Sequence, residues 1–373
     1  MATFVHRPHS LSRLAVGAVA VALLAGTLGA CADGDGADGG TGPAEKSTAG
    51  KTPAGSAPPA RDGGARDDGA RKAAGAPQVP AHALTGYWQN FTNEAKQQKL
   101  AEVPDAYDII AVSFADAAGQ PGEVGFKLAS KALGGYTVDQ FKADIKAKHQ
   151  AGKMVIVSVG GENGKVEVKD AAAAERFATS VHRLMTVYGF DGVDIDTENN
   201  GFRAEFMIQA LKSLREKAGP RLVLTMAPQT IDMQKPTDEY FRTALGVKDF
   251  LTVVNTQFYN SGSQLGCDGK SYQQGTVDFL TALACIQLEG GLDPSQVGLG
   301  LPTNKASKDA GYVDPSVIAK AMNCLTEGTD CGKFKPAKKY PGLRGAMAWS
   351  TNWDAAYGNE WSTAVGARVR KLP

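Results

Sequence analysis

Eight short apolar segments, separated by amphipathic stretches, constrain the fold of this chain more than any other feature of its sequence. They span residues 84–88, 107–114, 153–159, 190–196, 221–227, 250–259, 297–302 and 343–350. Most are too apolar at successive positions to be half-exposed, which is typical of strands buried on both faces of a parallel sheet.

The stretches between these segments have the periodicity of helices. Apolar residues form one buried stripe in 171–188, and the same pattern returns in 203–217. Strands alternating with helices predict a single α/β domain, a (β/α)8 TIM barrel. A doubly wound sheet would place a glycine-rich phosphate loop after its first strand, but Gln89-Asn90-Phe91 occupies that position.

Residues 1–30 are predicted to be a signal peptide. A basic start precedes an apolar run at 14–30, which lies at the short limit for a membrane span and ends in small residues. Leu28-Gly29-Ala30-Cys31 is similar to a bacterial lipobox, in which the thiol of Cys31 becomes lipidated; an ordinary signal peptide is the alternative. Both predict an exported protein, either extracellular or lipid-anchored to the outer face of the cell membrane.

Residues 31–82 are predicted to be a disordered linker. They are rich in Gly, Ala, Pro and charged residues and contain almost no large apolar side chains. Such a segment buries too little surface to offset the entropy lost on ordering. The folded domain is therefore expected over 83–373.

The formal net charge of +1 lacks the basic excess typical of nucleic-acid-binding proteins. It is compatible with a neutral substrate such as a sugar. We expect no nucleic-acid partner, and a membrane contact only through an anchor at Cys31.

Four cysteines lie in the folded domain: Cys267, Cys285, Cys324 and Cys331. An even number in an exported domain favours two disulfides, for which three pairings are possible. We expect the pairs closest in sequence, Cys267–Cys285 and Cys324–Cys331. Metal ligation is disfavoured because no CxxC spacing occurs and no histidine follows His182.

The fourth apolar segment ends in three carboxyl residues at alternating positions, Asp194, Asp196 and Glu198. Side chains two apart on a strand share a face, so all three are predicted to point into the mouth of the barrel. Asp191 has the opposite parity and lies at the start of the strand, which favours a structural role.

Burying three charges together is costly, so these carboxyl groups are expected to share protons and at least one pKa should rise. A general acid must arrive protonated, and Glu198 lies nearest the mouth. We therefore assign the acid role to Glu198. A cation site or a solvated acidic strand end is the alternative.

The stretch DGVDIDTE (191–198) resembles the signature of glycoside hydrolase family 18, which includes many bacterial chitinases. The SxGG element of that family has its counterpart in Ser158, Gly160 and Gly161. Other similar segments are GYWQNF (86–91), MAPQ (226–229), QFYN (257–260) and MAWSTNWD (347–354).

The resemblance implies hydrolysis of β-1,4 bonds between N-acetylglucosamine units by a retaining, substrate-assisted mechanism without cofactor or metal. Glu198 would protonate the glycosidic oxygen and later activate water. Asp196 would orient the 2-acetamido group, and Asp194 would share a proton with Asp196. Tyr259 would donate a hydrogen bond to the acetamido oxygen.

The resemblance also implies the substrate contacts. Trp349 would form the floor under the sugar, Met226 and Gln257 would line the same subsite, and Tyr87 would supply another aromatic platform. Asn260 replaces an aspartate found in many family members. It can still bond to sugar but carries no charge.

The segment between the seventh and eighth strands, residues 303–342, is too short for the inserted α+β domain of some relatives, because it must hold a helix near 315–326 and a cysteine pair. An open groove and endo-type cleavage are therefore expected. We expect a monomer whose partner is chitin or a chito-oligosaccharide.

Two other functions fit part of the pattern. An endo-β-N-acetylglucosaminidase acting on N-glycan cores would share the fold, Asp196 and Glu198. A non-catalytic chitin lectin would typically lose the acid that this chain keeps.

Overall fold

A computed structural model describes residues 78–198 and 200–373. The predicted signal peptide (1–30), Cys31 and the predicted linker up to residue 77 lie outside the described residues. Within the described part, the helices are too short or too polar to cross a membrane.

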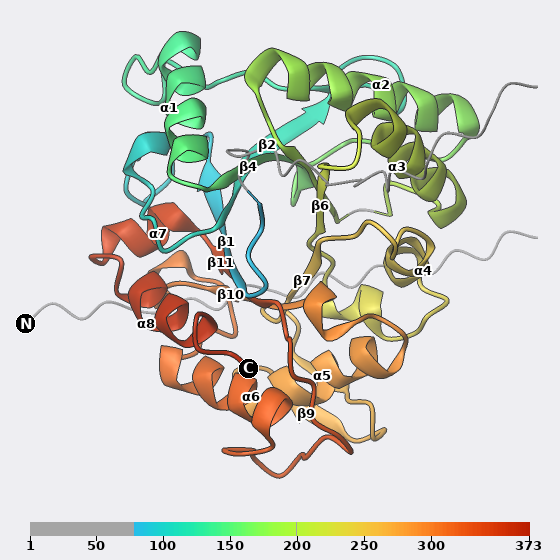
Figure 1. Cartoon of the computed structure of the whole chain (residues 1–373), viewed down its shortest axis with the longest axis vertical. Helices are drawn as coiled ribbons and strands as arrows, with labels where there is room; N and C mark the ends of the chain where they lie inside the picture. Colours follow the sequence, from blue (N-terminus) through green and yellow to red (C-terminus); the bar gives the residue numbers. More distant parts are fainter. Residues whose placement is uncertain (1–77, 199) are drawn as a thin grey trace, which may run out of the picture. The chain divides into compact units, whose positions relative to one another are not determined.

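Eight parallel strands form a closed barrel with helices around it (Figure 1). The strands are β1 (Ala83–Gln89), β2 (Ile109–Ala117), β4 (Met154–Gly161), β5 (Gly192–Thr197), β6 (Val223–Met226), β7 (Val253–Gln257), β10 (Val297–Pro302) and β11 (Gly345–Trp349). β1 pairs with both β11 and β2, which closes the barrel. Each of the eight apolar segments overlaps one strand, so the predicted (β/α)8 TIM barrel is confirmed.

The helices that surround the barrel are α1 (Val138–Gln150), α2 (Ala171–Tyr188), α3 (Ala204–Ala218), α4 (Glu239–Gly246), α5 (Val277–Glu289), α6 (Pro315–Glu327), α7 (Thr351–Ala356) and α8 (Glu360–Val369). Local sequence sets their ends. α2 begins after Asp170, whose side chain accepts a hydrogen bond from Ala173 N (2.7 Å), and ends at Gly189 in the left-handed conformation (φ 87°).

The shorter elements lie in the connections. β3 (Val124–Gly125) pairs with the end of β2, and β8 (Ser263–Leu265) and β9 (Ser271–Gln273) form a hairpin. The short 3₁₀ turns are η1 (Leu100–Glu102), η2 (Thr230–Met233), η3 (Pro294–Gln296) and η4 (Lys305–Ser307). Residues 303–342 hold η4, α6 and a disulfide, so no inserted domain is present between β10 and β11.

Alternation along the strands separates two apolar cores. One fills the barrel interior with inward side chains such as Ile109, Ile156 and Met347. The other, larger core lies between the strands and the helices and includes Val193 and Ile195 of β5. Asp194 and Asp196, which alternate with Val193 and Ile195 along β5, therefore face the barrel interior.

The ordered domain begins earlier than predicted. The Arg344 guanidinium donates to Pro80 O (2.7 Å) and Ala81 O (3.1 Å), and His82 Nδ1 lies 2.8 Å from Leu343 O. Residues 80–82 thus contact Leu343 and Arg344, directly before β11, and belong to the described domain rather than to the predicted linker.

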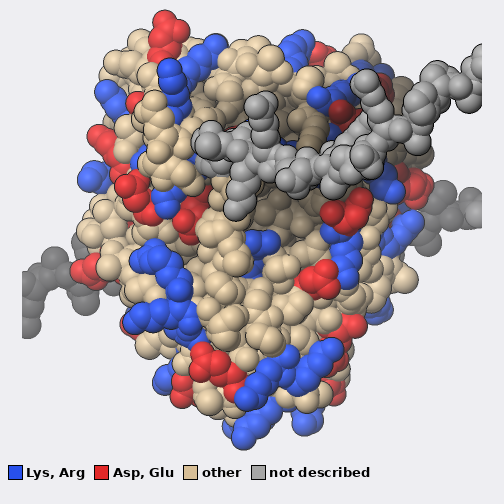
Figure 2. Space-filling view, in the orientation of Figure 1, with Lys and Arg blue, Asp and Glu red and all other residues tan. Residues whose placement is uncertain are grey.

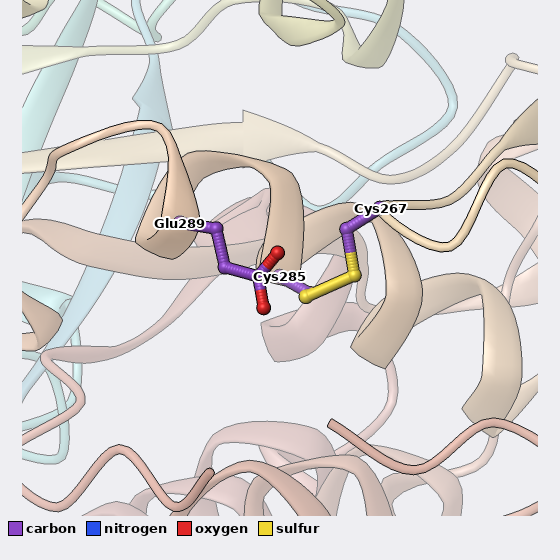
Figure 3. Close-up of side chains that lie close together, drawn as sticks. All are labelled: Cys267, Cys285 and Glu289. Atoms are coloured by element: carbon purple, nitrogen blue, oxygen red, sulfur yellow. A yellow bond between two sulfur atoms is a disulfide. The ribbon is translucent and has the colours of Figure 1, made fainter. Parts of the chain in front are cut away.

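Both expected disulfides, Cys267–Cys285 and Cys324–Cys331, are present. The Glu289 carboxylate lies beside the first pair (Figure 3). The two sulfur atoms are bonded to each other, and a disulfide sulfur lacks the thiolate charge with which cysteine holds metals. This cluster therefore braces α5 against the loop before β9.

Candidate active site

A pocket of about 830 Å³ opens at the C-terminal ends of the strands, where functional groups of barrels of this kind lie. Carboxyl groups line it: Asp116, Glu162, Asp196, Glu198 and Asp309. Lysine and arginine are absent from its described lining, although both charge signs are interspersed over the face in Figure 2. The pocket therefore gathers acidic side chains without the basic ones that accompany them on the face in Figure 2.

Asp194 lies beneath this pocket and is fully buried. Its carboxylate accepts hydrogen bonds from Tyr87 Oη (2.7 Å), Ser158 Oγ (2.7 Å) and Thr225 Oγ1 (2.5 Å). Strand register sets this arrangement, because Ser158 and Thr225 lie directly opposite Asp194 on β4 and β6. Burial raises the pKa of Asp194, and the three hydroxyl donors oppose that rise.

Asp196 is one level higher and 4% exposed. Gln257 Nε2 donates to Asp196 Oδ1 (2.9 Å) and also to Ala227 O (2.8 Å). Burial, followed by the charges of Asp194 and Glu198, raises the pKa of Asp196 well above its usual value. No hydrogen bond joins Asp194 and Asp196 in the described residues; the two interact through charge.

Glu198 follows β5 directly and lines the pocket. Gln229 Nε2 donates to Glu198 Oε2 (3.2 Å). Burial raises the pKa of Glu198; the amides of Gln257 and Gln229 lower it, and the charges of Glu162 and Asp309 raise it. A carboxyl group that holds its proton toward neutral pH is what a general acid requires.

Thr197, between the two pocket carboxyls, is fixed by Tyr240 of α4. The Tyr240 hydroxyl accepts from Thr197 N (2.7 Å) and lies 3.1 Å from Thr197 O as a donor. Tyr240 thus completes the hydrogen bonds at the end of β5, where the neighbouring β6 is already ending. In the sequence, only its place in a short helix distinguishes this tyrosine.

Gly160 and Gly161 allow β4 to pass close to this strand end. Both have positive φ angles, 118° and 79°. A Cβ on Gly160 would lie 2.3 Å from Asp196 O, and one on Gly161 would lie 2.7 Å from the Phe114 ring. The predicted structural role of the SxGG element matches this close approach.

Aromatic rings form one wall of the pocket. Phe91 and Phe114 are nearly parallel (centroids 6.4 Å apart, planes at 14°), and so are Phe114 and Trp349 (5.9 Å, 24°). Tyr259 is 8% exposed and also lines the pocket. Its hydroxyl makes no hydrogen bond within the described residues. The expected positions of Trp349, Gln257 and Tyr259 on the pocket therefore agree with the structure.

Two predicted substrate contacts need correction. Met226 is 0% exposed and belongs to the core beneath the helices, because its neighbour Thr225 is the inward residue of β6. Tyr87 is 1% exposed and directs its hydroxyl to Asp194. Neither side chain offers a surface to a sugar; Tyr87 acts from below the pocket instead.

The side chains of Asn260 and Asp191 form hydrogen bonds with other protein groups. Asn260 lines the pocket, but its amide donates to Asp309 Oδ1 (3.0 Å) and accepts from Ala310 N (2.7 Å), in the left-handed conformation (φ 51°). Asp191 accepts from Val155 N (2.7 Å) at the opposite end of β5, as expected for a structural residue.

The geometry of an acidic pocket at the end of β5 agrees with comparisons to known proteins. Residues 83–363 match the family model described as glycosyl hydrolases family 18. The chain belongs to this family.

A crystal structure of a putative chitinase A from Streptomyces coelicolor is 65% identical, with a TM-score of 0.77, and the match covers 78% of this chain and 99% of that one. Chitinase D of Niallia circulans is 35% identical over 75% of this chain. Exochitinase 1 of Streptomyces olivaceoviridis is 34% identical over 77% of this chain. The matches span only 60% and 56% of the length of these last two relatives.

Proposed function

We propose that this family 18 protein is a chitinase that cleaves β-1,4 bonds between N-acetylglucosamine units with retention of configuration. One observation carries the proposal. Asp196 and Glu198 face the same pocket, each with a raised pKa and with a glutamine amide donating to it. Similarity to proteins named chitinases supports the choice of substrate.

In the first step, Glu198 protonates the glycosidic oxygen while the carbonyl oxygen of the substrate's 2-acetamido group attacks the anomeric carbon. The glycosidic bond breaks, and an oxazolinium ion forms on the sugar. Gln257 occupies Asp196 Oδ1, which leaves Oδ2 to accept the acetamido N–H. The Tyr259 hydroxyl donates to the acetamido oxygen and aligns it for attack.

In the second step, the Glu198 carboxylate removes a proton from water as that water attacks the anomeric carbon. The oxazolinium ring opens and the acetamido group is restored. Glu198 is protonated again, so the cycle closes without any further proton source.

The lack of an inserted domain between β10 and β11 supports endo-type cleavage. The connection 303–342 carries one helix and a small disulfide loop, so it adds no domain that would wall the groove. A chain can then bind with sugar units on both sides of Trp349, which lines the pocket at the end of β11.

The product pattern tests the substrate and the mode of action together. Purified protein is incubated with chitohexaose and, in parallel, with a high-mannose glycoprotein. We expect a mixture of short chito-oligosaccharides at early times and no glycan release. Disaccharide alone from the first turnovers would contradict endo cleavage, glycan release alone would identify an endo-β-N-acetylglucosaminidase, and chitin binding without any product would identify a lectin.

We further propose an exported monomer that is anchored through a lipidated Cys31. The two disulfides support an oxidising compartment. Mass spectrometry of the mature N-terminus and size-exclusion chromatography of residues 32–373 test these two points.

A further inference from the structure

Gln229 follows β6 and lines the pocket beside Glu198, with Nε2 donating to Glu198 Oε2 (3.2 Å). We propose that Gln229 is a positioning residue that holds the general acid and selects which of its two carboxyl oxygens carries the proton. The role of Glu198 as an acid rests on the proposed function; the hydrogen bond and its effect on titration do not.

The backbone of Gln229 is fixed on both sides. Gln229 N donates to Asp232 Oδ2 (3.1 Å) at the start of η2, and Gln257 N donates to Pro228 O (2.9 Å). Gln229, beyond the end of β6, is also paired in a parallel bridge with Gln257, the last residue of β7. The Gln229 side chain therefore starts from a backbone that has little freedom to move.

The pairing places two amides side by side at the two pocket carboxyl groups. Gln257 Nε2 donates to Asp196 and to Ala227 O, and its amide also lowers the pKa of Glu198. Gln229 Nε2 donates to Glu198, so Gln229 is the amide whose side-chain hydrogen bond is made to the acid rather than to Asp196.

In a protonated carboxyl group the carbonyl oxygen is a better hydrogen-bond acceptor than the hydroxyl oxygen. Gln229 at Oε2 therefore favours the proton of Glu198 on Oε1. The proton then lies on the oxygen turned away from the amide, which is free to meet the glycosidic oxygen. After the proton leaves, the same N–H forms a stronger, charge-assisted bond with the carboxylate.

The Gln229 amide opposes the charge of the acidic groups that face Glu198 from neighbouring elements. The titratable groups there are Asp196 on β5, Glu162 after β4, Asp232 in η2, Asp309 after β10 and the neutral Tyr259 hydroxyl after β7. Asp232 is itself partly buried, with its pKa raised to about 6. Removing the Gln229 donor leaves these groups less opposed and makes Glu198 hold its proton to a higher pH.

The test replaces Gln229 by methionine, which has a similar length and no donor. We expect the alkaline limb of the kcat/KM profile on chitotetraose to rise by about one pH unit, because one hydrogen bond to the carboxylate is lost. Turnover at the optimum should fall about 10-fold as the acid loses its orientation. KM should change little.

Gln234→Met is the matched control. Gln234 lies in the same connection, and its amide donates to Gln264 (3.1 Å) instead of a pocket carboxyl group. This variant should keep the wild-type pH profile and turnover. Equal changes in both variants, or a lower thermal midpoint of Gln229→Met with an unchanged alkaline limb, would overturn the proposal and leave Gln229 a structural residue.

A titration that needs no activity separates the inference from the proposed function. The Glu198 carboxyl carbon is followed by ¹³C NMR and assigned by its loss in Glu198→Gln. Its pKa should rise by about one unit in Gln229→Met. If the pKa of Glu198 rises in Gln229→Met but the wild-type protein cleaves no chito-oligosaccharide, the chitinase proposal alone is wrong. If the pKa of Glu198 is the same in Gln229→Met as in the wild type, the inference is wrong.

Discussion

Asp194 and Asp196 are two residues apart on β5 and both are buried, but their surroundings differ. Asp194 accepts three hydroxyl hydrogen bonds from β1, β4 and β6, so its oxygens are already occupied. Asp196 and Glu198 above it accept hydrogen bonds from glutamine amides and line the pocket. The lower carboxylate is complete without a ligand, whereas the upper two remain available to a substrate.

This contrast explains how three acidic groups fit on one strand. A buried carboxylate with three donors bears its charge at tolerable cost, and that charge raises the pKa of Asp196 above it. Asp194, in the barrel interior, thus changes the pKa of a pocket carboxyl group without lining the pocket itself. Substitutions in the upper layer should therefore damage chemistry, and those in the lower layer should damage stability first.

The largest effect is expected from Glu198→Gln. The amide still accepts a hydrogen bond from Gln229 but has no acidic proton, so hydrolysis of chitohexaose should fall about 10³-fold or more. Sugar binding by calorimetry and the thermal midpoint should stay near wild type. Marked unfolding of this variant would move Glu198 from the catalytic layer to the structural one.

Asp196→Asn should rank next. The side-chain oxygen can still accept from Gln257, but the negative charge that would stabilise the proposed oxazolinium ion is lost. We expect turnover to fall about 10²-fold, measured as initial rates on chitotetraose, while the fold is kept. A rate close to wild type would remove Asp196 from the mechanism.

A smaller and different effect is expected from Tyr87→Phe, which removes one of the three donors to Asp194. Stability should fall by about 1–3 kcal/mol in denaturant unfolding, with turnover reduced less than about 10-fold. Tyr107→Phe is the control, because Tyr107 also donates to a buried aspartate, Asp354 (2.8 Å), away from the pocket. It should lower stability similarly and leave turnover unchanged. If Tyr87→Phe abolished turnover without loss of stability, the assignment of Asp194 and its donors to stability, and of Asp196 and Glu198 to chemistry, would be contradicted.

The smallest effect is expected from Asp309→Asn at the rim. The charge of Asp309 raises the pKa of Glu198, and asparagine keeps the acceptor used by Asn260. The alkaline limb of kcat/KM should therefore move down by about 0.3 pH unit, less at high salt. Asp249→Asn at the opposite end of the barrel should move nothing, and an upward shift in Asp309→Asn would contradict the sign of the interaction.

The fold could be predicted because its signals are local. Buried parallel strands read as apolar runs, and helices such as 171–188 carry their own stripe and caps. Strand parity also separated Asp194, Asp196 and Glu198 from Asp191 correctly. Cysteines close in sequence paired with each other as expected.

The errors arose where the site depends on neighbouring strands. Met226 was placed in the pocket because it opens a motif, but the register of β6 against β5 turns Thr225 inward instead. Gln229 and Tyr240 were missed because only the paired ends of β6 and β7 and the position of α4 bring them to β5. Tyr87 was assigned to the right strand but to the wrong level of the barrel.

The anomeric form of the first product tests the central claim most directly. If Asp196 and Glu198 serve the substrate's own acetamido group, cleavage of chitohexaose followed by ¹H NMR should release the β-anomer first, before mutarotation. Initial release of the α-anomer would mean direct attack by water. The upper carboxyl layer would then hold a base and an acid for inversion, and the substrate-assisted mechanism would be wrong.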